Sequence, residues 1–143
     1  MFQPSHFQKM AKHLGIDSLS YEKEYNGFMA KLKNFHESKG TPFRRLPWLG
    51  GQYLDLYLLY RKVTTAGGWL KITEEKRWRD IAEVFNLPPT CTNAAFALRQ
   101  HYSRYLESFE RINFFGKMQR MCCQLGGLIH PLEEAYSQHM YPQ

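Results

Sequence analysis

Apolar residues recur every three or four positions in several stretches of the chain, which is the spacing of an amphipathic helix. The first stretch predicts a helix over residues 21–38, with Ser20 as its N-cap and Gly40 after its end. The second predicts a helix over residues 52–66 that stops at Gly67. The inward positions are Tyr25, Phe28, Met29, Leu32, Phe35 and His36 in the first helix, and Leu56, Leu59, Tyr60 and Val63 in the second.

Residues 40–51, GTPFRRLPWLGG, lie between these two helices, and their prolines and glycines exclude a helix. We expect a loop or a short hairpin there, held against the core by Trp48. A third helix is predicted over residues 73–85, with Thr73 as N-cap and two acidic residues in its first turn, where the helix dipole favours them. The residues expected to face the core in this region are Trp69, Trp78, Ile81, Ala82 and Phe85.

The most informative stretch is residues 88–107, PPTCTNAAFALRQHYSRYLE, a small-residue loop that leads into a helix with two unlike faces. Together with the helix before it, this stretch predicts a helix-turn-helix with a long turn. The face expected inside the protein carries Ala95, Leu98, Tyr102, Tyr105, Leu106 and Phe109, and the other face carries Phe96, Arg99, Gln100, Ser103 and Glu107.

The charge of the chain is concentrated around this two-faced helix. The net charge is +6, and residues 28–116 hold 14 basic against 8 acidic residues, whereas the charges of the two flanking segments cancel. An apolar content of 43% in 143 residues indicates one folded domain. A local basic surplus indicates an anionic partner, and by itself it does not distinguish DNA from RNA or anionic lipid.

Sequence patterns of catalysis and of metal binding are missing from the chain. The glycine pairs lack the residues of a phosphate-binding loop, and no nucleophile elbow or HExxH pattern occurs. Three cysteines and six histidines show no spacing that builds a zinc site. We therefore expect no enzyme activity, no metal, no cofactor and no small-molecule substrate. Without a signal-peptide run or a long apolar run, we expect an intracellular protein with no membrane partner.

Three groups of side chains suit DNA. Thr90, Thr92 and Asn93 lie where a helix N-terminus attracts phosphate. Phe96, Arg99, Gln100 and Ser103 suit base edges in a major groove, and Arg44, Arg45 and Lys71 lie on segments able to reach flanking phosphates.

Simpler alternatives remain open for each group. The outer helix face has the pattern of an ordinary solvated face, and exposed basic residues are usually just solvated. Thr92 or Asn93 also fits the role of N-cap, which does not prevent a phosphate contact. Phe96 can fold back on Leu87 or Pro88.

The segments NFHESKGTPF, LDLYLLYRKVTTAGGW, WRDIAEVFNLP and CTNAAFALRQHYSRYLESFE resemble, in this order, the ARID family (AT-rich interaction domain) of DNA-binding domains. The last segment is most similar to the ARID of the subunit that marks PBAF-type SWI/SNF chromatin remodellers. The resemblance implies a helical domain whose recognition helix and preceding loop enter the major groove, while its first loop touches the DNA backbone. It places Thr90, Thr92, Asn93, Phe96 and Arg99 on the recognition segment, and Arg44 and Arg45 on the first loop.

We therefore expect an all-α multi-helix bundle with a helix-turn-helix, in which residues 20–116 form the DNA-binding domain. Residues 1–19 are expected to be an N-terminal extension and residues 117–143 a tail with short helices. The expected function is non-catalytic binding of double-stranded DNA. The resemblance implies a nuclear location, a role in transcription regulation or chromatin remodelling, and subunits of a SWI/SNF-type complex as further partners. The alternative, indicated by an apolar tail, is a protein-interaction scaffold of a chromatin complex with little DNA affinity.

Overall fold

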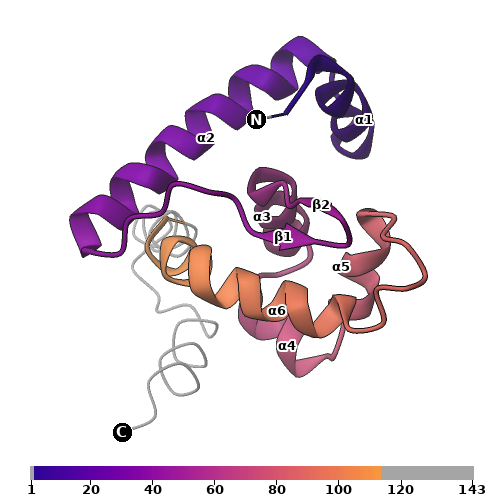
Figure 1. The fold of residues 1–143 in the computed structure, drawn as a ribbon. Helices are drawn as coiled ribbons and strands as arrows, with labels where there is room; N and C mark the ends of the chain where they lie inside the picture. The colour runs from indigo at the N-terminus through magenta and orange to yellow at the C-terminus, as the bar shows by residue number, and fades with distance from the viewer. Residues whose placement is uncertain (1, 114–143) are drawn as a thin grey trace, which may run out of the picture.

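The computed structural model describes residues 2–113, and its architecture is helical with one small hairpin (Figure 1). The predicted all-α class is confirmed, and the tail predicted over residues 117–143 lies outside the described residues. No helix in the described part is both long and apolar enough to cross a membrane. In chain order the elements are α1 (Pro4–Leu14), α2 (Ser18–Lys39), β1 (Trp48–Leu49), β2 (Gln52–Tyr53), α3 (Leu56–Thr65), α4 (Trp69–Glu74), α5 (Trp78–Val84) and α6 (Ala94–Tyr105).

α2 is the long helix along one side of the fold, and it carries the predicted inward stripe (Figure 1). Four of the six predicted positions are buried, and Phe28 and Phe35 are half-buried against the same core. The predicted N-cap is wrong. Asp17 caps the helix by accepting a hydrogen bond from the Ser20 backbone N–H at 2.9 Å, so α2 begins three residues earlier than expected.

α1 packs against α2 and is tied to the rest of the fold by one buried carboxylate. Asp55 lies 2.8 Å from His6 Nε2, and it also accepts a hydrogen bond from the Tyr21 hydroxyl. The same carboxylate caps α3 by accepting the Leu58 backbone N–H at 3.0 Å. α3 therefore begins four residues later than predicted, after the residues that form β2. Asp55 joins three helices, and the segment expected as an extension is a full helix.

The single helix predicted over residues 73–85 is wrong, because the chain forms α4 and α5 with a break between them. Lys76 adopts a φ of 56°, which a continuing helix does not allow. Thr73 lies inside α4 and caps nothing; its hydroxyl accepts the Trp78 indole N–H at 3.1 Å. A buried tryptophan needs a partner for its N–H, and this bond turns the chain back at the break.

α4, α5 and α6 enclose the aromatic centre of the C-terminal half. Trp69 is buried as predicted, and it stacks on Tyr102 with ring centroids 5.9 Å apart. The start of α4 has no side-chain cap from its own N-cap residue, Gly68. Instead, Glu110 accepts a hydrogen bond at 3.0 Å from the backbone N–H of Trp69, which lies 41 residues earlier in the chain. It also accepts one from the hydroxyl of Tyr102, eight residues earlier. Segments distant in sequence therefore fix the position of α6.

Candidate nucleic-acid interface

α6 is the predicted two-faced helix, and its two faces lie as predicted over its length. Leu98 and Tyr102 are fully buried, whereas Phe96 keeps 59% of its surface exposed and so does not fold back into the core. Within residues 2–113, the outward side chains make no hydrogen bond, ion pair or ring contact. The exposed set brought together on this face is Phe96, Arg99, Gln100 and Ser103.

Glu107 does not belong to this outward face, contrary to expectation. α6 ends at Tyr105. Helical backbone resumes over residues 107–113, and the turn between the two helical segments shifts which positions are buried. Leu106 at the junction has a φ of −121°, away from helical values. Glu107 is buried and its carboxylate lies 3.5 Å from the Arg111 guanidinium. The exposed polar face of α6 therefore stops one turn earlier than the sequence pattern indicates.

The N-terminal end of α6 provides backbone donors. Asn93 occupies the N-cap position, but its side chain makes no capping hydrogen bond. The first helical hydrogen bond runs from the Ala97 N–H to the Asn93 carbonyl at 2.9 Å, so the N–H groups of the first turn have no helical acceptor. Thr90 and Thr92 are exposed in the turn before it. Such an end attracts an anionic oxygen.

The hairpin holds the loop that precedes α6. Gly50, at the hairpin turn, has a φ of +62°, and a Cβ there would lie 2.8 Å from Leu87 Cδ2 and 3.2 Å from Pro88 Cδ. The positive φ favours glycine, and a Cβ here would require the Leu87 and Pro88 side chains to shift. The hairpin turn therefore rests directly on the start of the loop over residues 86–93.

Trp48 is exposed, so the prediction that it packs against the core is wrong. The hairpin register pairs Trp48 with Tyr53 on one face, with ring centroids 4.9 Å apart, and turns Leu49 inward. In a hairpin whose turn is at Gly50 and Gly51, side chains alternate between the two faces, so Trp48 and Tyr53 share one face. This alternation is the sequence signal that indicates the exposed aromatic pair. The pair was missed as a candidate contact surface.

The hairpin also contacts the middle of α6 through His101. Burial and the nearby Arg104 guanidinium lower the pKa of the His101 imidazole, and a hydrogen bond with the Trp48 backbone partly opposes this shift. The ring is therefore neutral at physiological pH. This contact places the hairpin beside α6.

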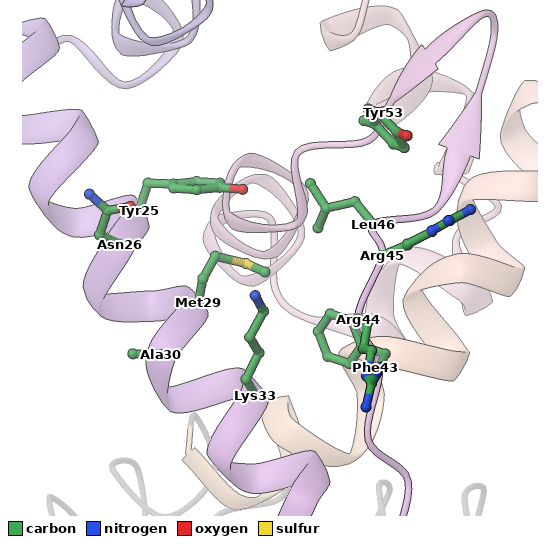
Figure 2. A pocket seen from close by; sticks show the side chains of 10 residues that line it. All are labelled: Tyr25, Asn26, Met29, Ala30, Lys33, Phe43, Arg44, Arg45, Leu46 and Tyr53. Carbon is green, nitrogen blue, oxygen red and sulfur yellow. The ribbon is translucent and has the colours of Figure 1, made fainter. Parts of the chain in front are cut away.

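Arg44 and Arg45 lie on the segment that connects α2 to the hairpin and runs beside α6 (Figure 1). The segment is fixed there by Phe43, whose ring lies 5.1 Å from that of Tyr105. Both arginines are exposed, and within the described residues neither pairs with a carboxylate. Figure 2 shows Arg45 pointing away from α2. The segment thus brings basic groups to the border of the α6 surface.

Lys71 is not brought to this surface by any contact in the described part. It lies on α4, where its aliphatic stem covers Gly67. α4 packs on the buried side of α6 through the stack of Trp69 on Tyr102. Lys71 is exposed on α4.

Comparison with known protein families matches residues 24–110 to the ARID/BRIGHT DNA binding domain. The chain is 50% identical over 90 residues to AT-rich interactive domain-containing protein 2 of Mus musculus, across 63% of this chain and 5% of that protein. It is 37% identical over 127 residues to High mobility group B protein 15 of Arabidopsis thaliana, across 81% of this chain and 28% of that protein. It is also 42% identical over 92 residues to AT-rich interactive domain-containing protein 3B of Homo sapiens, across 64% of this chain and 16% of that protein.

The chain thus spans less than a third of the length of each of these relatives. The matched range begins within α2 and ends at Glu110, so it includes the hairpin, the loop over residues 86–93 and all of α6. The chain belongs to the ARID/BRIGHT family of DNA-binding domains.

Proposed function

We propose that this protein is a non-catalytic module that binds double-stranded DNA by placing the outward face of α6 in the major groove. The arginine and the glutamine of that face match the acceptors and donors of guanine and adenine edges, and Phe96 suits a thymine methyl group. Thr90, Thr92 and Asn93, at the N-terminal end of α6, bind a neighbouring phosphate. Arg44 and Arg45 bind the backbone to one side.

One observation carries this proposal. Four side chains able to contact base edges are exposed on one helix face without any partner in the described residues, next to a helix end with free backbone donors. A merely solvated helix face carries similar residues, but solvation alone does not explain exposed, unpaired arginines beside the helix together with an uncapped N-terminus. Lys71, exposed on α4, is proposed as a further phosphate contact.

The salt dependence of binding to a duplex tests the proposal. If about five to seven phosphates are neutralised, log K plotted against log salt falls with a slope of roughly −5 to −6. Fluorescence anisotropy of a labelled duplex measures this slope. The double variant R44A/R45A is expected to reduce its magnitude by about 2, because two phosphate contacts are lost.

The double variant K23A/K31A provides the matched control, because it removes the same charge from exposed positions of α2 away from α6. It should leave the slope close to that of the unchanged chain. A flat salt response in a folded protein would contradict DNA binding and favour the scaffold alternative. Equal slopes for both double variants would contradict the assignment of Arg44 and Arg45.

We further propose that the protein acts in the nucleus, in transcription regulation or chromatin remodelling, with subunits of a SWI/SNF-type complex as partners. The support is the resemblance of residues 91–107 to the ARID of a remodeller subunit and the 50% identity to AT-rich interactive domain-containing protein 2. Tagged protein isolated from nuclei should co-elute with the remodeller ATPase at stoichiometric levels. Its recovery without that ATPase would contradict the partner assignment and leave DNA binding to be judged by the salt series.

A further inference from the structure

A groove of about 420 Å³ separates α2 from the segment over residues 43–46. Figure 2 shows the groove from close by, with α2 along one wall and the segment along the other. Tyr53 of β2 closes one end. This volume lies in the range of sites that hold a compact apolar group together with its polar flanks.

The floor of the groove is apolar except for one hydroxyl. Met29, Phe43 and Leu46 supply the apolar atoms. Tyr25 is 2% exposed, its hydroxyl points into the groove in Figure 2, and within residues 2–113 it has no hydrogen-bond partner. Burial and then the negative charge of Asp55 raise the pKa of Tyr25, so this hydroxyl stays protonated. The hydroxyl is open to the groove, where it can donate a hydrogen bond to an acceptor on a ligand.

The rim of the groove is cationic. Lys33 stands on the α2 side and Arg44 on the other, whereas Arg45 lines the groove but its guanidinium points away from α2. Within the described part of the chain none of the three pairs with a carboxylate, and no Asp or Glu lines the groove. Unpaired cations around an apolar floor are complementary to a ligand that has a bulky apolar group between negative charges.

We propose that this groove binds a short acidic segment of a partner protein, anchored by a bulky apolar side chain. The anchor contacts Met29, Phe43 and Leu46, an oxygen of the segment accepts the Tyr25 hydroxyl, and its carboxylates pair with the rim. A DNA backbone carries the negative charge but has no large apolar group to cover the floor, so the groove favours a peptide. Peptide binding does not require DNA binding, although Arg44 serves both proposed sites.

A labelled peptide of three Asp-Phe-Glu-Leu repeats tests the groove against the full chain by fluorescence anisotropy. We expect binding in the micromolar range, and much weaker binding of the same peptide with lysine in place of each acid. Lys33→Glu should weaken binding about tenfold, and the control Lys31→Glu less than about twofold, because Lys31 makes the same charge change on α2 outside the groove. Tyr25→Phe, which keeps the ring, should weaken binding about threefold.

The methyl resonance of Met29, identified with the Met29→Leu variant, reports the location. We expect the acidic peptide to shift it and duplex DNA to leave it unchanged. Failure of the peptide to bind, equal binding of the lysine peptide, or equal losses in the two lysine variants would overturn the proposal. A shift of the Met29 resonance by duplex DNA would also overturn it and identify nucleic acid as the occupant. The affinity of each lysine variant for duplex DNA is measured separately. This measurement distinguishes failure of the peptide proposal from failure of DNA binding.

Discussion

Polar groups near the two ends of α6 differ in burial and in hydrogen bonding. Towards the N-terminal end, Arg99 and Gln100 are exposed and have no partner in the described residues. Just beyond the C-terminal end, Glu110 is 1% exposed and accepts hydrogen bonds from the Trp69 N–H and the Tyr102 hydroxyl. A buried polar group without a partner costs about 1–3 kcal/mol, so the fold must satisfy it. An exposed one costs little and stays available to a ligand.

The largest expected effect is at the buried end. Glu110→Ala leaves the Trp69 N–H and the Tyr102 hydroxyl buried without their acceptor, so the free energy of unfolding should fall by about 3 kcal/mol. Urea denaturation measures this change. Ser103→Ala on the exposed face is the control and should change stability by less than about 0.5 kcal/mol. A loss below about 1 kcal/mol at Glu110 would remove the contrast between the two ends.

At the exposed end, Arg99→Ala should weaken binding to duplex DNA by about 1–3 kcal/mol while the free energy of unfolding stays within about 0.5 kcal/mol. The expected cause is loss of a bidentate contact with a base edge. Anisotropy with a set of duplexes chosen from a random pool measures both the loss and its dependence on sequence. Equal losses on every duplex would make Arg99 a phosphate contact instead.

A pair of glycine variants tests whether the hairpin supports the exposed end. Gly50→Ala and Gly51→Ala both place a side chain at positive φ, but only the Cβ at position 50 meets Leu87 and Pro88. Gly50→Ala should therefore destabilise the protein by about 1–2 kcal/mol more than Gly51→Ala. It should also weaken DNA binding more, because the loop before α6 is displaced. Indistinguishable unfolding curves would show that the contact at the hairpin turn does not constrain the loop.

The smallest expected effect is on the pH dependence of stability. The pKa of His101 is lowered in the folded state, chiefly by burial and then by Arg104. Below its usual pKa near 6.5, the unfolded chain binds a proton that the folded ring does not, so this residue's stabilising contribution is lost as pH falls below that value. His101→Gln should flatten that part of the melting-temperature profile. An unchanged profile would show that His101 does not contribute to it.

Periodicity was sufficient to predict α2, α6 and most of the core, because each helix buries one continuous stripe. It failed where a single long-range bond decides the outcome. Thr73 has the local pattern of an N-cap, but the Trp78 indole uses its hydroxyl and splits the helix in two. Residues 1–14 are polar enough to resemble a loose extension, yet Asp55 holds His6 from 49 positions away.

The exposure of side chains was predicted correctly where the signal lies within one helix, and wrongly where it depends on strand pairing. Phe96 and Arg99 follow from the spacing of α6 itself. Trp48 was expected inside because large aromatic residues are usually buried, but the register with Tyr53 turns it outward. For Lys71 the sequence provides the charge, but helix periodicity does not determine where α4 lies relative to α6.

The contact between His36 and Tyr105 limits where residues can be inserted into or deleted from this chain. His36 is buried, and its Nε2 lies 2.7 Å from the carbonyl oxygen of Tyr105, the last residue of α6, while its Nδ1 lies 2.9 Å from Thr41 Oγ1. Inserting or deleting one residue within α6 would rotate everything beyond that point by about 100° and remove the carbonyl from this position. Related proteins should therefore gain and lose residues in the loop over residues 86–93, and keep the number of residues between Asn93 and Tyr105 constant.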